Sequence, residues 1–253
     1  MSANPEAAKD ETIVLHDAFV PHGRTVPFEN GWSWIASAWS IFKRAAGVWI
    51  GMIIVLCIIY VVLGIVPIVG AIATIVAAPA FTGGLMLASR TIDQGGEAHF
   101  AQLFGGFRHR FGPLVGIGVL YLIGMAVIVL IVGLTTGASV FTVINATTLE
   151  EVMAAGAGLM LAALTFLALV TPLLMAVWFA PALVVFHDIG TIAAMKASFV
   201  GCVRNMLPFL LYGIVFFIAS ILASIPAMLG WLILGPVTAA SIYTGYRDIY
   251  FTS

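Results

Sequence analysis

The ionisable side chains that could do chemistry lie at the ends of long apolar segments. The chain has 253 residues, of which only 8% are Asp, Glu, Lys or Arg. Six ionisable residues close apolar runs: Arg90, Asp93, His187, Asp188, Arg247 and Asp248. Two interpretations stay open for them. They cap helix ends and fix the topology, or they form a cluster that grips an anionic headgroup or substrate.

Residue patterns of known catalytic, metal and cofactor sites are absent from the sequence. The five histidines are scattered, and no two lie at metal-ligand spacing in an apolar run. The nucleophile pattern Gly-x-Ser-x-Gly is missing, and so is a phosphate-binding loop. Cys57 and Cys202 are far apart and are interpreted as small hydrophobic residues. We therefore predict no catalytic residue, no metal, no cofactor and no enzymatic activity.

The composition is that of a protein whose main solvent is lipid. Hydrophobic residues make up 62% of the chain, whereas soluble proteins have roughly half. Too few polar side chains are present to cover a particle of this size in water, which predicts a polytopic membrane protein. Ten Lys and Arg against eleven Asp and Glu leave no basic excess, so no nucleic-acid partner is expected.

The apolar runs predict six membrane-spanning helices. The expected spans are about 47–66, 70–90, 112–134, 155–186, 207–225 and 230–249, and residues 1–29 form a polar tail. The first and last runs are long enough for two spans each, and turns are expected at Pro67 to Gly70 and at Pro226 to Gly230. Thr148-Leu-Glu-Glu151 has the spacing of a capping box and predicts a helix start.

The distribution of basic residues predicts the orientation. With six spans, all ten Lys and Arg fall on one side, and the other side carries only Glu150 and Glu151. The positive-inside rule then places both termini in the cytoplasm. Aromatic residues on the same side are interpreted as an interfacial belt: Trp32, Trp34, Trp39, Tyr243, Tyr246 and Tyr250.

Three segments in front of spans 1, 3 and 5 predict a repeat. Each, at about 31–45, 96–110 and 190–205, has an apolar stripe with helical spacing. The stripes are Ile35, Trp39 and Phe42; Phe100, Phe104 and Phe107; and Met195, Phe199 and Cys202. The predicted fold is all-α integral membrane, with six transmembrane helices, three interfacial amphipathic helices on the cytoplasmic side and a threefold helix-plus-hairpin repeat. Such repeats are parallel, with an axis along the membrane normal.

Basic residues at the joins and at the span ends are the candidate binding residues. They are Lys43, Arg44, Arg90, Arg108, His109, Arg110, Arg204 and Arg247. Lys and Arg near the membrane surface attract anionic lipid, and the planar fork of Arg takes phosphate oxygens in pairs. We expect membrane lipids, anionic ones among them, as ligands. A protein partner or a second copy of the chain is also expected on this surface.

Several stretches resemble a known protein family. They are Gly31-Trp-Ser-Trp-Ile-Ala-Ser-Ala-Trp-Ser-Ile-Phe, Gly47-Val-Trp-Ile-Gly51, Pro79-Ala-Phe-Thr-Gly-Gly-Leu-Met-Leu-Ala-Ser-Arg90 and Leu103-Phe-Gly-Gly-Phe107. The chain resembles an uncharacterised family of proteobacterial polytopic inner-membrane proteins, sometimes called BPSS-type membrane proteins. The resemblance runs from about residue 30 to the end and is most specific over 31–122. It implies a multi-pass fold in the bacterial inner membrane and carries over no catalytic residue.

Two classes of function fit these observations, and a third, a membrane-embedded enzyme, is the weakest because no acid/base pair or metal cluster is visible. The first is a non-enzymatic inner-membrane protein with an accessory role in binding lipid or a partner. The alternative is a transporter or channel for a small neutral or amphiphilic solute. No ionisable residue lies in the middle of a predicted span, which speaks against a charged cargo. A continuous polar cavity through the helices would favour transport.

Overall fold

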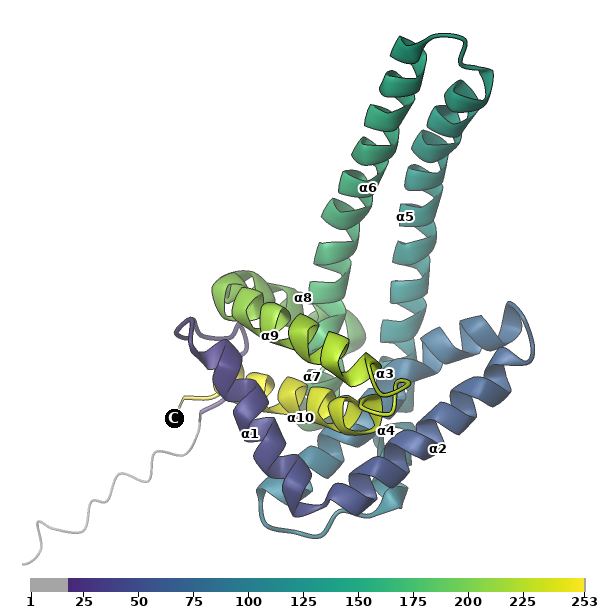
Figure 1. Cartoon of the computed structure of the whole chain (residues 1–253). Helices are drawn as coiled ribbons and strands as arrows, with labels where there is room; N and C mark the ends of the chain where they lie inside the picture. Colours follow the sequence, from purple (N-terminus) through teal and green to yellow (C-terminus); the bar gives the residue numbers. More distant parts are fainter. Residues whose placement is uncertain (1–17, 253) are drawn as a thin grey trace, which may run out of the picture.

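Three helical hairpins leave a common base in different directions (Figure 1). The computed structural model describes residues 18–252. The first hairpin joins α2 (Ala46–Gly64) to α3 (Val69–Asp93), and the third joins α9 (Met206–Ser224) to α10 (Trp231–Tyr250). The second, which we call the arm, joins α5 (Phe111–Asn145) to α6 (Leu149–Trp178) and α7 (Ala180–His187). The base is the end of the molecule where α3, α7 and α10 end.

Each hairpin is preceded by a short helical segment on the base. These segments are α1 (Asn30–Arg44), the 3₁₀ helix η2 (Phe100–Phe104) with α4 (Gly105–His109), and α8 (Thr191–Arg204). The chain bends after each at a single residue, with φ/ψ of −143°/39° at Ala45, −144°/44° at Arg110 and −120°/33° at Asn205. Arg110 follows Ala45 by 65 positions and Asn205 follows Arg110 by 95, the offsets of the predicted stripes.

The turns of the first and third hairpins require glycine. A Cβ on Gly70 would lie 1.7 Å from the Leu63 carbonyl oxygen, and one on Gly230 would lie 2.5 Å from the Ala223 Cα. The two helices of each hairpin approach too closely there for any side chain. Both turns lie where Pro and Gly predicted them.

In the second hairpin, a capping box follows the turn and begins α6. The Thr148 hydroxyl accepts a hydrogen bond from the Glu151 N–H at 3.2 Å, and the Thr148 N–H donates to the Glu151 carboxylate at 3.1 Å. This pair satisfies N–H groups at the start of α6 that lack a helical partner. The predicted helix start is confirmed.

Within residues 18–252, five helices are long and apolar enough to cross a membrane, against six predicted spans. They are α2, α3, α5, α6 together with α7 (Leu149–His187), and α9. The last predicted span, α10, is not among them. Its second half carries Tyr243, Thr244, Tyr246, Arg247 and Asp248, which lower its hydropathy. This half of α10 packs inside the base rather than against lipid.

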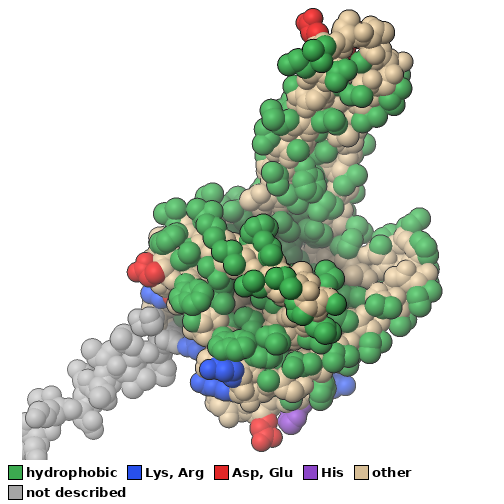
Figure 2. All heavy atoms as spheres, in the orientation of Figure 1, with side chains coloured by type: hydrophobic (Ala, Val, Ile, Leu, Met, Phe, Trp, Pro, Cys, Tyr) green, Lys and Arg blue, Asp and Glu red, His purple; other side chains and the backbone are tan. Residues whose placement is uncertain are grey.

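The core lies in the base, at the ends of the helices that return from each hairpin. Met86 on α3, Leu183 on α7 and Ile249 on α10 are fully buried. Most large side chains along the hairpins are exposed instead, and Figure 2 shows many apolar atoms along the arm and the Lys and Arg atoms at the base, with acidic atoms at the tip of the arm. Such exposure is expected where hydrocarbon is the solvent.

The amphipathic stripes predicted for the segments on the base are buried only in part, since Phe42 and Cys202 are buried and other members are exposed. The buried face of α1 holds Trp34, Ala38 and Ile41, one position before the predicted stripe. The middle residues of the three predicted stripes are exposed: Trp39 by 43%, Phe104 by 39% and Phe199 by 38%. Apolar residues of an interfacial helix can face lipid as well as protein, so periodicity does not identify the buried face.

The predicted aromatic belt is also wrong for most of its members. Trp34, Tyr243, Tyr246 and Tyr250 are at most 4% exposed and belong to the core. Trp32 and Trp39 remain exposed on α1. Tyr and Trp favour membrane interfaces because they combine an apolar ring with a polar group, and the same combination suits a core with hydrogen-bond partners.

The predicted polar tail is part of the base over its described residues. The Val20 N–H donates to the Tyr250 carbonyl and the Arg24 N–H to the Ile249 carbonyl, each at 2.8 Å. Phe19 and Phe251 form a single antiparallel bridge. The interpretation of residues 1–29 as a separate tail is therefore wrong from residue 18 onward, and residues 1–17 lie outside the described part.

Candidate anion-binding site on the base

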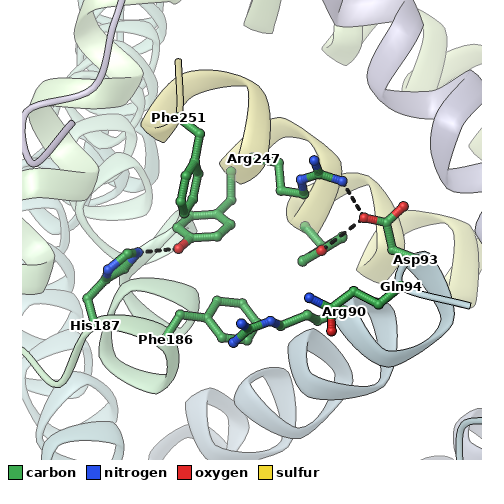
Figure 3. A pocket seen from close by; sticks show the side chains of 9 residues that line it. Arg90, Asp93, Gln94, Phe186, His187, Arg247 and Phe251 are labelled. Atoms are coloured by element: carbon green, nitrogen blue, oxygen red, sulfur yellow. Dashed lines mark hydrogen bonds and ion pairs between the residues drawn. The ribbon is translucent and has the colours of Figure 1, made fainter. Parts of the chain in front are cut away.

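The ends of the three returning helices surround a polar pocket, which we call the central pocket (Figure 3). Its volume is about 360 Å³. It is lined by Arg90, Asp93 and Gln94 from α3, Phe186 and His187 from α7, Tyr243, Tyr246 and Arg247 from α10, and Phe251. Arg90, His187 and Arg247 stand in the last turns of their helices, where the helix dipole favours positive charge.

Most charges in the central pocket are already paired. Arg247 forms an ion pair with Asp93, and the Tyr243 hydroxyl donates to the same carboxylate at 3.1 Å (Figure 3). His187 and Tyr246 share a hydrogen bond. The Arg90 guanidinium lies 5.3 Å from the centre of the Phe186 ring. Arg90 therefore lines the pocket without an ion pair to any carboxylate of residues 18–252.

Arg90 and Gln94 also line a second depression, between α3, η2 and α4, which we call the basic groove. Its volume is about 460 Å³. The lining residues are Leu87, Arg90, Thr91, Gln94, His99, Ala101, Gln102, Gly105, Arg108 and His109. No Asp or Glu is among these described residues. Asp93 points away from the groove, toward Arg247 and Tyr243.

Glycines hold the two sides of the basic groove together. A Cβ on Gly106 would lie 2.1 Å from the Ala80 carbonyl oxygen, and one on Gly84 would lie 2.2 Å from the Leu103 carbonyl oxygen. The backbones of α4 and η2 thus rest directly on α3, which places Arg108 beside Arg90. Gly84 and Gly106 belong to the stretches that carry the family resemblance, so these stretches build the groove.

Hydrogen bonds fix the polar wall of the groove. The Gln102 amide donates to the Thr91 hydroxyl at 2.7 Å and accepts from the His99 N–H at 3.0 Å. Arg108 is exposed and, within the described residues, forms neither an ion pair nor a hydrogen bond. Two arginines with unused N–H donors, Arg90 and Arg108, therefore face one groove, which suits an anion with several oxygens.

The other predicted binding residues lie elsewhere. Arg110 forms an ion pair with Asp188, and Arg204 donates to the carbonyls of His22 at 3.2 Å and Gly23 at 2.9 Å. Arg44 reaches the Ile92 carbonyl at 3.5 Å, and Lys43 is exposed at the end of α1. The structure brings Arg90, Arg108 and His109 together in the groove, and Arg90 and Arg247 in the central pocket.

Several lining residues carry no signal in the sequence. Phe186 lies at the end of an apolar run, and Tyr246 is one of the aromatic residues that the sequence assigns to an interfacial belt. Gln94 and Gln102 stand in the loop and short helix that follow α3, where polar residues are ordinary. Only the chain topology shows that Phe186 and Tyr246 line the central pocket, that Gln102 lines the basic groove and that Gln94 lines both.

Comparison with known proteins identifies the same broad class as the fold does. The chain is 28% identical over 200 residues to a probable inner membrane protein of Burkholderia thailandensis, a match that covers 76% of this chain and 74% of the relative. No protein-family model and no solved structure matches the chain. Together with the five apolar helices, the match confirms the predicted resemblance to a bacterial inner-membrane protein.

Proposed function

We propose that this chain is a non-enzymatic inner-membrane protein that binds anionic lipid at the basic groove. The observation that carries the proposal is the charge of the groove, where Arg90, Arg108, His99 and His109 meet without a carboxylate. Arginine forks bind phosphate oxygens in pairs, and each basic residue near an anionic membrane surface contributes roughly 1 kcal/mol.

The proposal includes the six-span topology with both termini in the cytoplasm. The bends at Ala45, Arg110 and Asn205, with similar backbone angles and the offsets of the stripes, support a threefold helix-plus-hairpin repeat. Arginines gather on the base, and Glu150 and Glu151 stand at the far end of the arm. The positive-inside rule then puts the groove at the level of the inner-leaflet phosphates.

The exposed apolar residues of the base support a position at the membrane surface. Trp39, Phe104 and Phe199 each stand on the segment before a hairpin and each face outward. Interfacial helices place such side chains among the upper acyl chains while their basic residues remain at the phosphates. Phe104 lies next to the groove, so a lipid bound there would contact both kinds of residue.

The alternative, transport of a neutral or amphiphilic solute, has less support. Along α7, the fully buried Ala182, Leu183 and Val184 separate Pro181, which faces an apolar cavity, from Phe186, which lines the central pocket. A layer of packed side chains between two cavities favours binding over passage.

Two neighbouring arginines allow a matched test. Arg108 lies in the groove without a carboxylate, whereas Arg110 is paired with Asp188. We expect Arg108→Gln to weaken retention of phosphatidylglycerol about fivefold, measured by native mass spectrometry from mixed bilayers with phosphatidylethanolamine. Arg110→Gln should lower the melting temperature and leave the lipid preference unchanged. Equal retention by Arg108→Gln and wild type, or an equal loss in both variants, would overturn the proposal.

A further inference from the structure

A third cavity lies among the three hairpins, and we call it the hairpin cavity. Its volume is about 370 Å³. Every hairpin contributes to its wall, with Tyr60 and Thr74 from the first, Tyr121 and Trp178 from the second, and Ile242 from the third. The lining is almost entirely apolar and includes no charged residue. Figure 2 shows the surface hollowed where the arm leaves the base.

The hairpin cavity lies deep in the apolar layer. Along α3, its lining residues Thr82 and Thr74 stand before Arg90 by about 12 Å and about 24 Å, at 1.5 Å per residue. A hydrocarbon core is about 30 Å thick. With Arg90 at the lipid phosphates, as proposed above, these lining residues lie in the hydrocarbon layer, where a charged ligand would be strongly disfavoured.

Four polar groups on the wall of this cavity have no hydrogen-bond partner. They are the hydroxyls of Thr74, Tyr60 and Tyr121 and the indole N–H of Trp178, none of which bonds to any described residue. Edge-to-face ring contacts hold Tyr60 against Phe81 at 6.0 Å and Trp178 against Phe209 at 5.9 Å. These contacts orient the rings and leave the polar groups unused.

Several other hydroxyls on the apolar helices bond a carbonyl of their own helix. Thr82 donates to the Ala78 carbonyl at 3.0 Å, Thr171 to the Leu167 carbonyl and Ser220 to the Phe216 carbonyl, both at 2.7 Å. A polar group without a partner costs several kcal/mol in hydrocarbon, because no water is there to replace the bond. Unpartnered polar groups also occur elsewhere among the described residues, as at the Trp49 indole N–H. Four of them on the wall of one cavity point to a ligand that bonds them.

We infer that the hairpin cavity binds an uncharged amphiphile dissolved in the bilayer, whose apolar chain fills the cavity and whose hydroxyl or carbonyl group bonds Tyr60, Tyr121 and Trp178. The missing charge on the wall excludes an ionic headgroup, and the apolar lining disfavours a chain of water molecules. This site is separate from the basic groove and does not rest on anionic-lipid binding.

The inference is tested with two radiolabelled probes of equal chain length, hexadecanol and hexadecane, on the full chain purified in detergent. Wild type should retain hexadecanol more tightly than hexadecane. In the double variant Tyr60→Phe/Tyr121→Phe, which keeps both rings, hexadecanol affinity should fall about tenfold, as expected for lost hydrogen bonds, while hexadecane binding stays the same. Equal affinity of wild type for both probes, or unchanged hexadecanol affinity in the double variant, would refute the inference.

A variant that fills the cavity gives a second measurement. Ala78 lines the cavity, whereas Ala71 on the same helix is exposed on its outside. Ala78→Phe should abolish hexadecanol binding, and Ala71→Phe should bind it as wild type does, with both variants melting as folded proteins. Arg108→Gln should leave hexadecanol binding unchanged. Hexadecanol binding by a folded Ala78→Phe variant would place the probe elsewhere and overturn the assignment.

Discussion

The side-chain amide of Asn205, at the bend after α8, bonds both to α8 and to the segment before α1. Its side chain is 1% exposed, accepts from the Val26 N–H at 2.8 Å and donates to the carbonyls of Arg24 at 2.9 Å and Gly201 at 2.8 Å. These bonds hold the segment before α1 against the bend between α8 and α9. A buried amide with three partners is costly to replace, because each partner keeps its desolvation cost.

We therefore expect Asn205→Leu to lower the free energy of unfolding by about 3 kcal/mol, measured by chemical denaturation in detergent. Asn145→Leu is the matched control. Asn145 is exposed at the end of the arm and bonds only within its own helix, so its replacement should change stability by less than about 0.5 kcal/mol. Equal effects of the two substitutions would contradict this role of Asn205.

The side chain of Cys202 is buried, and we expect its thiol to be unreactive in the folded protein. It is 1% exposed and its thiol donates to the Met175 carbonyl at 3.5 Å. Burial raises the pKa of the Cys202 thiol to about 12, so the thiol stays protonated at pH 8, where the reactive thiolate would otherwise begin to form. We predict no labelling of Cys202 by a water-soluble maleimide at pH 8, and full labelling after denaturation. Rapid labelling of the folded protein would show that this packing is wrong.

At the residue scale, the sequence identifies the candidate basic residues. It does not show which of them are already paired with another residue of the chain. Arg108 and Arg110 look alike in sequence, yet one faces an open groove and the other pairs with Asp188, far along the chain. The Arg204 guanidinium likewise donates hydrogen bonds to backbone carbonyls. Such long-range pairs depend on the packing of separate hairpins, which no local pattern records.

At the element scale, the contact between α3 and α4 depends on Gly106. Because any Cβ there would lie 2.1 Å from the Ala80 carbonyl, Gly106→Leu must push α4 away from α3. We expect a loss of at least about 2 kcal/mol in stability, together with loss of phosphatidylglycerol retention. Gly112→Leu is the control, since nothing lies within 4 Å of its added Cβ. Wild-type behaviour of Gly106→Leu would contradict the close contact.

Helix positions are the part of the fold that local sequence predicts well. Apolar runs, Pro67, Pro226 and the Thr148 capping box place the hairpins and their turns correctly. The buried faces of the helices are predicted poorly. In lipid both the outside and the core are apolar, so the burial of Tyr246, or the exposure of Trp39, cannot be derived from hydrophobic periodicity.

At the scale of the whole molecule, the number of spans decides on which side of the membrane the C-terminus lies. Five helices are apolar enough to cross, and α10 is not, so the two counts place the C-terminus on opposite sides. We predict six crossings, because α9 and α10 form a closed hairpin like α2 and α3. Fusions of alkaline phosphatase or a fluorescent protein should report residues 97 and 253 as cytoplasmic and residue 147 as periplasmic. A periplasmic residue 253 would establish the count of five.

The length of the arm makes it a mechanical lever. α5 has 35 residues, about 52 Å at 1.5 Å per residue. The returning helix α6 ends before Phe179, whose backbone N–H donates to the Ser198 hydroxyl at 2.9 Å. α6 has 30 residues, about 45 Å, so a rotation of about 10° about Phe179 would displace the tip of the arm by about 8 Å. A small rotation about Phe179 would therefore become a displacement of several ångströms at Glu150 and Glu151, at the far end of the arm.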